Sequence, residues 1–323
     1  MKTVEHTTTV AAPPRTVYGI IADTGRWPVH FEPTVHVEQL EQRLEQGSGT
    51  ERFRIWAVAG KEVKSWTSRR ELDLEGLRIT FRQEVSQPPV AAMAGAWILR
   101  PQPDGGTALA LQHSYRAVGD DPGDLAWIDE VTDRNSRTEL ANIAALAEAA
   151  AEREELTLSF EDTVLVDGDA DDVHAFIRHA QDWPERLPHV SRMVLREDDP
   201  GVQIMEMDTV TADGSRHTTS SVRVCLDGTP RRIVYKQTVL PPLLTAHTGV
   251  WTVAAAADGV AVTSGHTVVI RPEAVTKVLG DGATIADARE FAHTALSGNS
   301  RITLEHAKAF AEGRRTGTPR SRA

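Results

Sequence analysis

Residues 63–74 read V-K-S-W-T-S-R-R-E-L-D-L and alternate with the period of a β-strand that buries one face. The apolar face carries Trp66, Ser68, Arg70, Leu72 and Leu74. A guanidinium is nearly always charged, so an inward Arg70 needs partners inside the protein. Two interpretations follow from this strand alone. Either Arg70 lines a pocket for oxygen-rich groups, or it pairs with a buried carboxylate or reaches the rim of the interior.

Strand-like alternation and turn-forming glycines continue on both sides of this segment. The predicted strands cover residues 5–10, 35–44, 50–58, 63–74, 77–85, 95–100 and 108–117. A short helix follows Pro13-Pro14, and after Pro122 the apolar period becomes that of a helix of about 30 residues, roughly 45 Å long. The pattern indicates an α+β fold in which the long helix covers the apolar face of a curved antiparallel sheet. A ligand would lie between the sheet and the helix.

The same order of features occurs twice in the chain, which indicates a duplicated module. The matched pairs, first copy and then second, are Trp27-Pro28 and Trp183-Pro184, Phe81 and Tyr235, Gly95 and Gly249, Trp97 and Trp251, His113 and His266, and Asn135-Ser136-Arg137 and Asn299-Ser300-Arg301. The repeat is too long for a solenoid, so we expect two tandem domains, residues 1–154 and 155–313. We expect residues 314–323, which are basic and contain Gly, Thr and Pro, to form a disordered tail.

Composition restricts the possible partners and compartments. The 323 residues include 35 Lys and Arg against 46 Asp and Glu, and a net charge of −11 argues against nucleic acid as a partner. No stretch approaches the roughly 18 apolar residues of a membrane span, and the N-terminus lacks the apolar region of a secretory signal. The single cysteine, Cys225, allows no intramolecular disulfide and no thiolate cluster for a metal. We therefore expect a cytoplasmic protein that binds neither membrane nor nucleic acid.

Several of these features resemble one known family. Ala12-Pro13, Trp27-Pro28, the W-T-S-R-R stretch and the long final helix are similar to those of the polyketide aromatase/cyclases of bacterial type II polyketide synthases. That family has the helix-grip fold shared with START and Bet v 1-like proteins, and the doubled module resembles its di-domain subclass over about residues 3–312. The resemblance implies cyclisation and dehydration of a poly-β-ketone held on an acyl carrier protein. It also implies that the other synthase components are partners and that no cofactor or metal is used.

The resemblance also implies which residues line the pocket. The family's strand arginine and serine, with their aromatic neighbours, correspond to Trp66, Ser68 and Arg70, and the tryptophan after the first helix corresponds to Trp27. Alternation had already placed Trp66, Ser68 and Arg70 on one inward face. Family members often have a tyrosine soon after the Trp-Pro pair. Residues 31–36 read F-E-P-T-V-H instead, so Thr34 or His36 would have to replace it.

The expected chemistry assigns a role to three side chains. Ring closure needs an enolate and a polarised ketone held within reach of each other. We expect Arg70 to stabilise the developing negative charge, and Ser68 to hydrogen-bond a carbonyl oxygen or a water. We expect His113 to transfer protons, because histidine is the usual group that titrates near neutral pH. The other interpretation of His113 is a core histidine bonded to a backbone carbonyl.

Further candidate substrate-binding residues come from the predicted inward faces and from the resemblance. They are Trp66, Trp27, Gln83, Trp97, Tyr115 and Thr34. Gln83 either contacts substrate or braces the sheet, because a buried amide needs partners. The tryptophans fit a packing role individually, although an aromatic lining would suit a flat product.

The second copy departs from this pattern. In residues 217–226 the apolar face carries Ser220, Val222, Val224 and Leu226, which places Arg223 outside. A register shift of one residue would turn T-x-S-x-R inward, but we favour the outward assignment. The first domain would then hold the reactive pocket. The second would hold an apolar cavity in which His266 and Tyr235 are candidate substrate-binding residues.

A binding protein is the main alternative function. A helix-grip protein that binds a hydrophobic ligand or polyketide without chemistry would differ from an enzyme by few groups. A hydrolase is poorly supported because Gly-x-Ser-x-Gly is absent, and no HExxH pattern points to metal chemistry.

Overall fold

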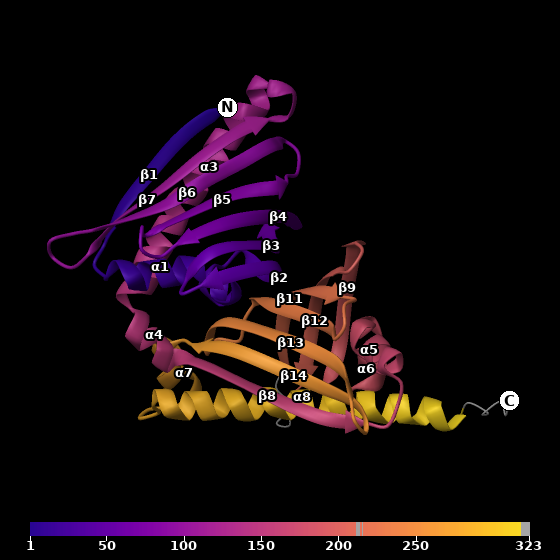
Figure 1. Cartoon of the computed structure of the whole chain (residues 1–323). Helices are drawn as coiled ribbons and strands as arrows, with labels where there is room; N and C mark the ends of the chain where they lie inside the picture. The colour runs from indigo at the N-terminus through magenta and orange to yellow at the C-terminus, as the bar shows by residue number, and fades with distance from the viewer. Residues whose placement is uncertain (211–213, 215, 318–323) are drawn as a thin grey trace. The chain divides into compact units, whose positions relative to one another are not determined.

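The structure, a computed structural model, describes residues 1–210, 214 and 216–317. Its internal contacts divide the chain into two compact units, Met1–Glu154 and Glu155–Ala323 (Figure 1). No helix in the described part of the chain is long and apolar enough to cross a membrane.

The first unit is built on one antiparallel sheet of seven strands, in the order β1-β7-β6-β5-β4-β3-β2. The strands are β1 (Lys2–Val10), β2 (Thr34–Glu45), β3 (Ser48–Ala59), β4 (Glu62–Asp73), β5 (Arg78–Val85), β6 (Val90–Pro101) and β7 (Thr107–Ala117). The helices are α1 (Pro14–Ala22), η1 (Thr24–Arg26), α2 (Trp27–His30), η2 (Val118–Asp120), α3 (Pro122–Glu148) and α4 (Ala150–Leu156), the last leading into the second unit. The expected α+β fold with a long helix after the last strand is confirmed.

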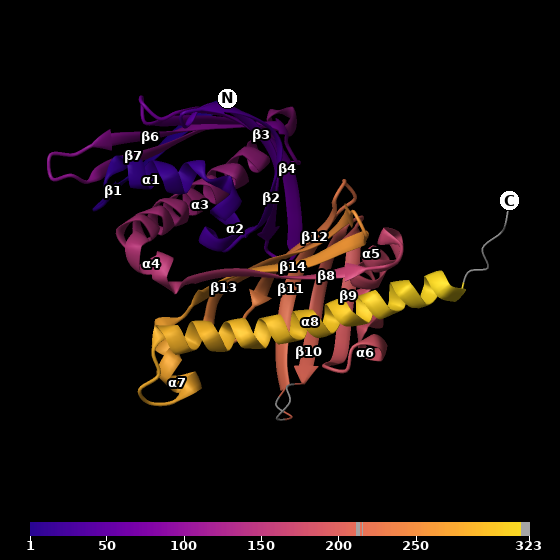
Figure 2. The ribbon, with the colours of Figure 1, turned by 60° about the horizontal axis from the view of Figure 1, so that its bottom comes forward.

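The second unit repeats this topology with a sheet in the order β8-β14-β13-β12-β11-β10-β9 (Figure 2). Its strands are β8 (Thr157–Val166), β9 (Val190–Asp199), β10 (Val202–Val210), β11 (Arg216–Leu226), β12 (Arg231–Val239), β13 (Leu244–Ala256) and β14 (Gly259–Ile270). Its helices are α5 (Ala170–Arg178), η3 (Ala180–Asp182), α6 (Trp183–Arg186), η4 (Pro272–Ala274), α7 (Val275–Leu279) and α8 (Ile285–Gly317).

The expected start of the disordered tail at residue 314 is wrong. Helix α8 continues to Gly317, because Arg314 pairs with Asp172 and Arg315 pairs with Asp167. The rest of the expected tail, residues 318–323, lies outside the described residues.

In each unit the long helix runs across one face of the sheet (Figures 1 and 2). Helix α3 buries a stripe of residues at helical spacing, among them Ile128, Thr132, Ser136, Leu140 and Ile143. Its side chains also fix it along strand β1: His6 Nε2 lies 2.9 Å from Asp133 Oδ1, and the Ala11 N–H donates to Glu148 Oε1 at 2.9 Å. The helix is therefore held against the edge strand near its middle, and against the residue that follows β1 at its C-terminal end.

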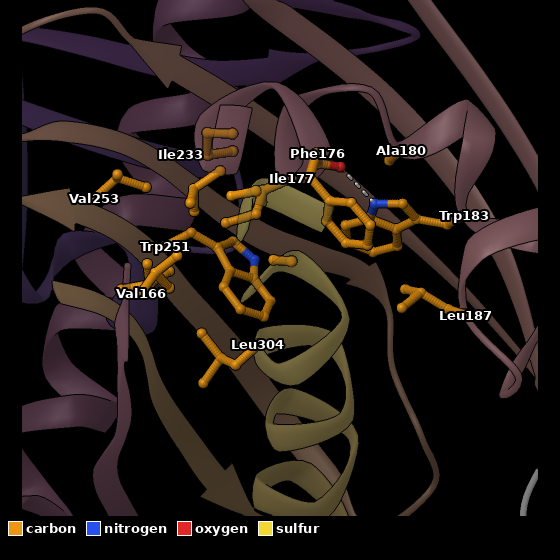
Figure 3. Close-up of a cluster of buried hydrophobic side chains, with 14 of the residues drawn as sticks. Val166, Phe176, Ile177, Ala180, Trp183, Leu187, Ile233, Trp251, Val253 and Leu304 are labelled. Atoms are coloured by element: carbon orange, nitrogen blue, oxygen red, sulfur yellow. Dashed lines mark hydrogen bonds between the residues drawn. The ribbon is translucent and has the colours of Figure 1, made fainter. Parts of the chain in front are cut away.

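The core of the second unit joins all of its layers (Figure 3). Phe176 and Ile177 of α5 and Trp183 of α6 pack with Trp251 of the sheet and Leu304 of α8. The Trp183 Nε1–H donates to the Phe176 carbonyl at 3.1 Å, so the only polar group of the indole is satisfied in an apolar surrounding.

The repeated glycines on β6 and β13 have a structural cause. A Cβ on Gly95 would collide with the ring of Phe81, and a Cβ on Gly249 would collide with the ring of Tyr235. Each aromatic ring therefore lies against the bare backbone of the neighbouring strand, which explains why the aromatic residue and the glycine recur together.

We predict that Gly249→Ala destabilises the protein by about 1–3 kcal/mol, because the added methyl group overpacks the Tyr235 ring. The control is Gly298→Ala in α8, where a Cβ meets open space and the change should stabilise by about 0.5–1 kcal/mol. Denaturant titration of both variants measures this difference. Equal stability of the two variants would contradict the ring contact.

Candidate functional site

Arg70 is buried and paired, as one of the two interpretations of its strand required. Its side chain is 2% exposed, and its Nε and Nη2 lie 2.6 and 2.5 Å from Oε1 of the equally buried Glu51 on β3. Its Nη1 donates to the Ile21 carbonyl at 2.7 Å and its Nη2 to the Ala22 carbonyl at 2.6 Å, both at the end of α1. Every nitrogen of this guanidinium therefore has a protein acceptor.

Aromatic rings enclose the same guanidinium. Its Cζ lies 5.0 Å from the ring centroid of Trp27 and 5.4 Å from that of Phe53. Burial lowers the pKa of Arg70 below its ordinary value, and the Glu51 carboxylate opposes this shift. Arg70 thus joins the sheet to the first helix and is packed inside the wall of the domain.

Two apolar clusters pack inside the first unit. The larger contains Leu72, Ile79, Trp97, Leu109, Leu111, Leu140 and Ile143. The smaller is formed by Tyr115, Ala117 and Ile128, with Met93 against it. His113 is the inward residue between Leu111 of the larger cluster and Tyr115 of the smaller cluster on β7.

We call these residues the polar belt: Ser68 of β4, Gln83 of β5, His113 of β7, and Ser136 and Glu139 of α3. Cross-strand register joins them, since Ser68 pairs with Gln83 and Phe81 pairs with Gly95, which in turn pairs with His113. Gln83, His113 and Glu139 are half-buried although they face inward, which indicates an interior that is partly open at this level.

Three polar atoms in or next to the polar belt have no hydrogen-bond partner among the described residues. They are Ser68 Oγ, Trp66 Nε1 and His113 Nε2. Some other polar atoms without a hydrogen-bond partner, such as Trp27 Nε1 and His6 Nδ1, are fully buried. The three atoms named above are not among those buried atoms. Each of the three therefore retains accessible surface, and a substrate oxygen could bind there.

His113 faces α3 and an aromatic ring. Its Nδ1 lies 3.4 Å from Ser136 Oγ, and its ring makes an edge contact with Phe81 at 5.4 Å between centroids. Burial, and to a smaller extent the neighbouring His6, lowers the pKa of His113 to about 4. The imidazole is therefore neutral at physiological pH and can act as an acceptor or donor of a hydrogen bond.

The remaining candidates are spread through the unit. Trp97 lies in the larger cluster, and Trp27 packs edge-on against Phe31 and Phe53 at 5.8 Å. The Tyr115 hydroxyl donates to Asp129 and burial raises the pKa of Tyr115 above its ordinary value. Thr34 is buried at the start of β2. Tyr115 is two residues from His113 on β7, the same separation as that of Trp66 from Ser68 on β4.

Gln83 has protein partners, and His36 lies on the other side of the sheet. The Gln83 carbamoyl oxygen accepts from Ser86 Oγ at 2.9 Å, and its nitrogen lies 3.8 Å from Met93 Sδ. His36 stacks on Trp56, opposite in register on the outer face, with 5.7 Å between ring centroids. His36 therefore does not replace a tyrosine in the interior.

Sequence reasoning missed two acidic residues. Glu51 shares the inward face of β3 with Phe53 and Ile55, so alternation in residues 48–59 could have identified it. Glu139 lies one helical turn after Ser136 on the inward stripe of α3, and helical spacing could have identified it.

The second unit has a matching set of polar residues that bond to one another. His266 Nε2 lies 2.7 Å from Ser300 Oγ and 3.2 Å from Ser264 Oγ, while its Nδ1 lies 3.0 Å from the Tyr235 hydroxyl. His247 Nε2 also lies 3.0 Å from that Nδ1. Burial lowers the pKa of His266 to about 4 and that of His247 to about 3, so both rings are neutral in this network.

The outward assignment of Arg223 is wrong. Arg223 is 1% exposed, its Nη2 donates to the Ile177 carbonyl at 2.6 Å, and its Cζ lies 5.5 Å from the ring centroid of Trp183. The sequence misled because Val222 and Val224, on the opposite face of β11, are buried as well. Gln203 pairs with Arg223 in register where Glu51 pairs with Arg70, and burial lowers the pKa of Arg223 to about 10.

Comparison with known proteins agrees with this architecture. The model of the family described as polyketide cyclase / dehydrase and lipid transport matches residues 1–148 and 157–312. Two solved structures, the di-domain aromatase/cyclases BexL of the BE-7585A pathway and StfQ of the steffimycin pathway, align with TM-scores of 0.87 and 0.86. They are 52% and 38% identical, and each alignment covers 97% of this chain and 99% of the other.

Relatives of known name are similarly close over the whole chain. The actinorhodin polyketide synthase bifunctional cyclase/dehydratase of Streptomyces coelicolor is 49% identical over 318 residues, covering 95% of this chain and 96% of that protein. The granaticin counterpart of Streptomyces violaceoruber is 46% identical over 309 residues, covering 95% and 94%. The fold is thus that of the two-domain helix-grip proteins. The chain belongs to the polyketide cyclase/dehydrase family, which confirms the resemblance and the enzyme class expected from the sequence.

We predict that Arg70→Met destabilises the protein by about 3–5 kcal/mol, because it leaves the Glu51 carboxylate buried without its partner. Glu51→Leu should also destabilise, and the double variant should lose less than the sum of the two single changes. A double-mutant cycle in denaturant measures the coupling. Additive losses would show that the pair does not act as a unit.

We also predict that the His113 ring stays neutral as the pH falls to about 4. Its unfolded pKa is higher, about 6.5, so its contribution to stability is complete above that pH and is lost as the pH falls toward the folded value. Nitrogen chemical shifts of the ring, assigned with His113→Gln, report its protonation. A midpoint near the unfolded value would contradict the buried position.

Proposed function

We propose that the protein catalyses aldol cyclisation and dehydration of a poly-β-ketone, giving the first aromatic ring of an aromatic polyketide. The observation that carries this proposal is the set of unpartnered inward polar atoms on Ser68, Trp66 and His113. They lie on the inward face of the sheet that also carries the two apolar clusters, in a chain that belongs to the polyketide cyclase/dehydrase family.

The chemistry needs a folded substrate more than it needs a reactive side chain. Holding the enolate carbon and the ketone carbon in contact can supply several kcal/mol of the barrier, about 7 or more in well-oriented cases. Trp66 and Phe81 offer flat apolar surfaces, and Ser68 Oγ can donate to a ketone oxygen as charge develops on it. These groups select one folding of a flexible chain.

In place of the expected role as an oxyanion stabiliser, we propose a positioning role for Arg70. Its donors bind Glu51 and the end of α1, so it fixes β3 and β4 relative to that helix. Trp66 and Ser68 precede Arg70 on the same face of β4, and their placement depends on this anchor.

The second unit has a structural role in this proposal, because both ring nitrogens of His266, the counterpart of His113, already have protein partners. We further propose that the substrate arrives on an acyl carrier protein of a type II polyketide synthase in the cytoplasm. The relatives named as polyketide synthase cyclase/dehydratases support this partnership.

We predict that Ser68→Ala lowers the yield of the correctly cyclised product about tenfold, the value of one hydrogen bond to a reacting oxygen. The matched control is Ser221→Ala, since Ser221 holds the equivalent inward position in the second unit. Product analysis of a reconstituted synthase, with and without each variant, measures this effect. If the unchanged protein alters no product, the proposed function is wrong and a binding role is favoured.

A further inference from the structure

The inward histidine on the last strand of each sheet has a different set of neighbours in each unit. In the second unit, the ring nitrogens of His266 lie within hydrogen-bond distance of four side chains that the structure describes, those of Tyr235, His247, Ser264 and Ser300. In the first unit, the Nδ1 of His113 lies 3.4 Å from Ser136 Oγ. The other nitrogen, Nε2, has no partner among the described residues and is not one of the fully buried atoms.

Strand register identifies the first-unit counterparts of these neighbours. Tyr235 and Phe81 correspond, because each pairs with the glycine that in turn pairs with the histidine. His247 and Met93 correspond, because each lies two residues before that glycine on the adjacent strand. A phenol and an imidazole of the second unit are therefore replaced by a phenyl ring and a thioether in the first.

The third neighbour on the sheet is replaced in the same way. Ser264 lies two residues before His266 on β14, and Leu111 lies two residues before His113 on β7. The neighbour on the long helix is a serine in both units. The three sheet positions that offer hydrogen bonds to the histidine in the second unit are thus apolar in the first, where they are Phe81, Met93 and Leu111.

The three apolar side chains belong to the clusters of the first unit and offer little to a ring nitrogen. Leu111 is fully buried in the larger cluster, and Phe81 packs against that cluster with its ring edge-on to His113 at 5.4 Å between centroids. Met93 packs against the smaller cluster, and its sulfur lies 3.8 Å from Gln83 Nε2. A thioether is a weak acceptor and cannot donate, and a phenyl ring has no polar hydrogen.

Charge does not distinguish the two histidines. Burial lowers the pKa of both His113 and His266 to about 4, so both rings are neutral at physiological pH. A neutral imidazole has one donor nitrogen and one acceptor nitrogen, and polar groups in a protein interior are normally bonded. The difference between the units therefore lies in which side chains surround the ring.

We propose that Phe81 and Met93 determine where the substrate binds, because they leave one nitrogen of His113 without a protein partner. This inference rests on the proposed function and adds a reason why the first unit, rather than the second, holds the substrate. A neutral imidazole nitrogen can donate to a ketone oxygen or accept from an enol hydroxyl, and a poly-β-ketone carries both groups. At His266 the same substrate would first have to displace protein partners.

The test is Phe81→Tyr in the full chain. The Tyr235 ring shows that a phenol fits against the bare glycine backbone of the next strand and reaches the nitrogen that the helix serine does not bind. The new hydroxyl should reach His113 in the same way. In the reconstituted synthase we expect the yield of correctly cyclised product to fall about tenfold, because the substrate must displace one hydrogen bond. Phe81→Tyr combined with Met93→His should lower the yield further.

Two controls separate hydrogen bonding from size. Replacement of Phe81 by para-fluorophenylalanine adds similar bulk without a donor, so it should keep most of the yield that Phe81→Tyr loses. Phe291→Tyr adds a hydroxyl to an exposed ring on α8 and should equal the unchanged protein. Equal losses from the fluorinated ring and from Phe81→Tyr would overturn the proposal. If Phe81→Tyr does not fold, Met93→His is measured in its place, with the same expected loss.

Nitrogen chemical shifts of the rings at neutral pH provide a readout that does not depend on activity. In Phe81→Tyr the signals of His113 should move toward those of His266. The reverse exchange in the second unit, Tyr235→Phe with His247→Met, should move the signals of His266 toward those of His113. His113→Gln and His266→Gln assign the signals. Unchanged shifts in both exchanges would show that these side chains do not control the partners of the histidines.

The outcomes separate this inference from the proposed function. If the unchanged protein redirects the products and Phe81→Tyr does so equally well although its hydroxyl binds His113, this inference alone is wrong. If the unchanged protein has no effect on the products, the proposed function fails and this inference fails with it.

Discussion

The contact between Arg70 and Glu51 sets the geometry on which the rest of the first unit depends. Two opposite charges buried together must satisfy each other, because each would be costly alone, and this fixes β3 and β4 face to face. The remaining donors of the guanidinium hold the carbonyls that end α1. One side chain thus connects the sheet, the first helix and the aromatic rings of Trp27 and Phe53, and the polar belt is built beside it.

The two units have the same fold and differ in the polar residues of their interiors. Arg223 occupies the inward position of Arg70, but Gln203 replaces the carboxylate, and a backbone carbonyl and the Trp183 ring surround the cation. In the second unit, Tyr235, Ser264 and Ser300 all bond to His266, while His247 Nδ1 and Gln237 Oε1 are buried without a partner. The first unit leaves Ser68, His113 and Glu139 without full partners. Unsatisfied groups in an interior are what a binding site requires and what a stable core avoids.

The sequence predicted the strands, the long helices and the duplication, because alternation and helical spacing record burial along a single element. It predicted the inward face of β4 correctly, since the other face carries exposed Glu71 and Asp73. It failed for β11, where Val222 and Val224 make both faces apolar. Glu51 and Glu139 escaped notice because each is one carboxyl group whose surroundings come from distant segments. No local pattern distinguishes a paired acid from a free one.

The bare backbone at Gly95 and Gly249 has a consequence for how such a protein can diversify. Because the ring from the adjacent strand rests directly on that backbone, a phenyl and a phenol occupy the same place without moving the sheet. In the second unit the Tyr235 hydroxyl hydrogen-bonds to His266. In the first unit Phe81 has no hydroxyl and makes only a ring-edge contact with His113. The ring on this backbone thus helps to decide, through one oxygen atom, how many hydrogen-bond partners the neighbouring imidazole has inside the protein.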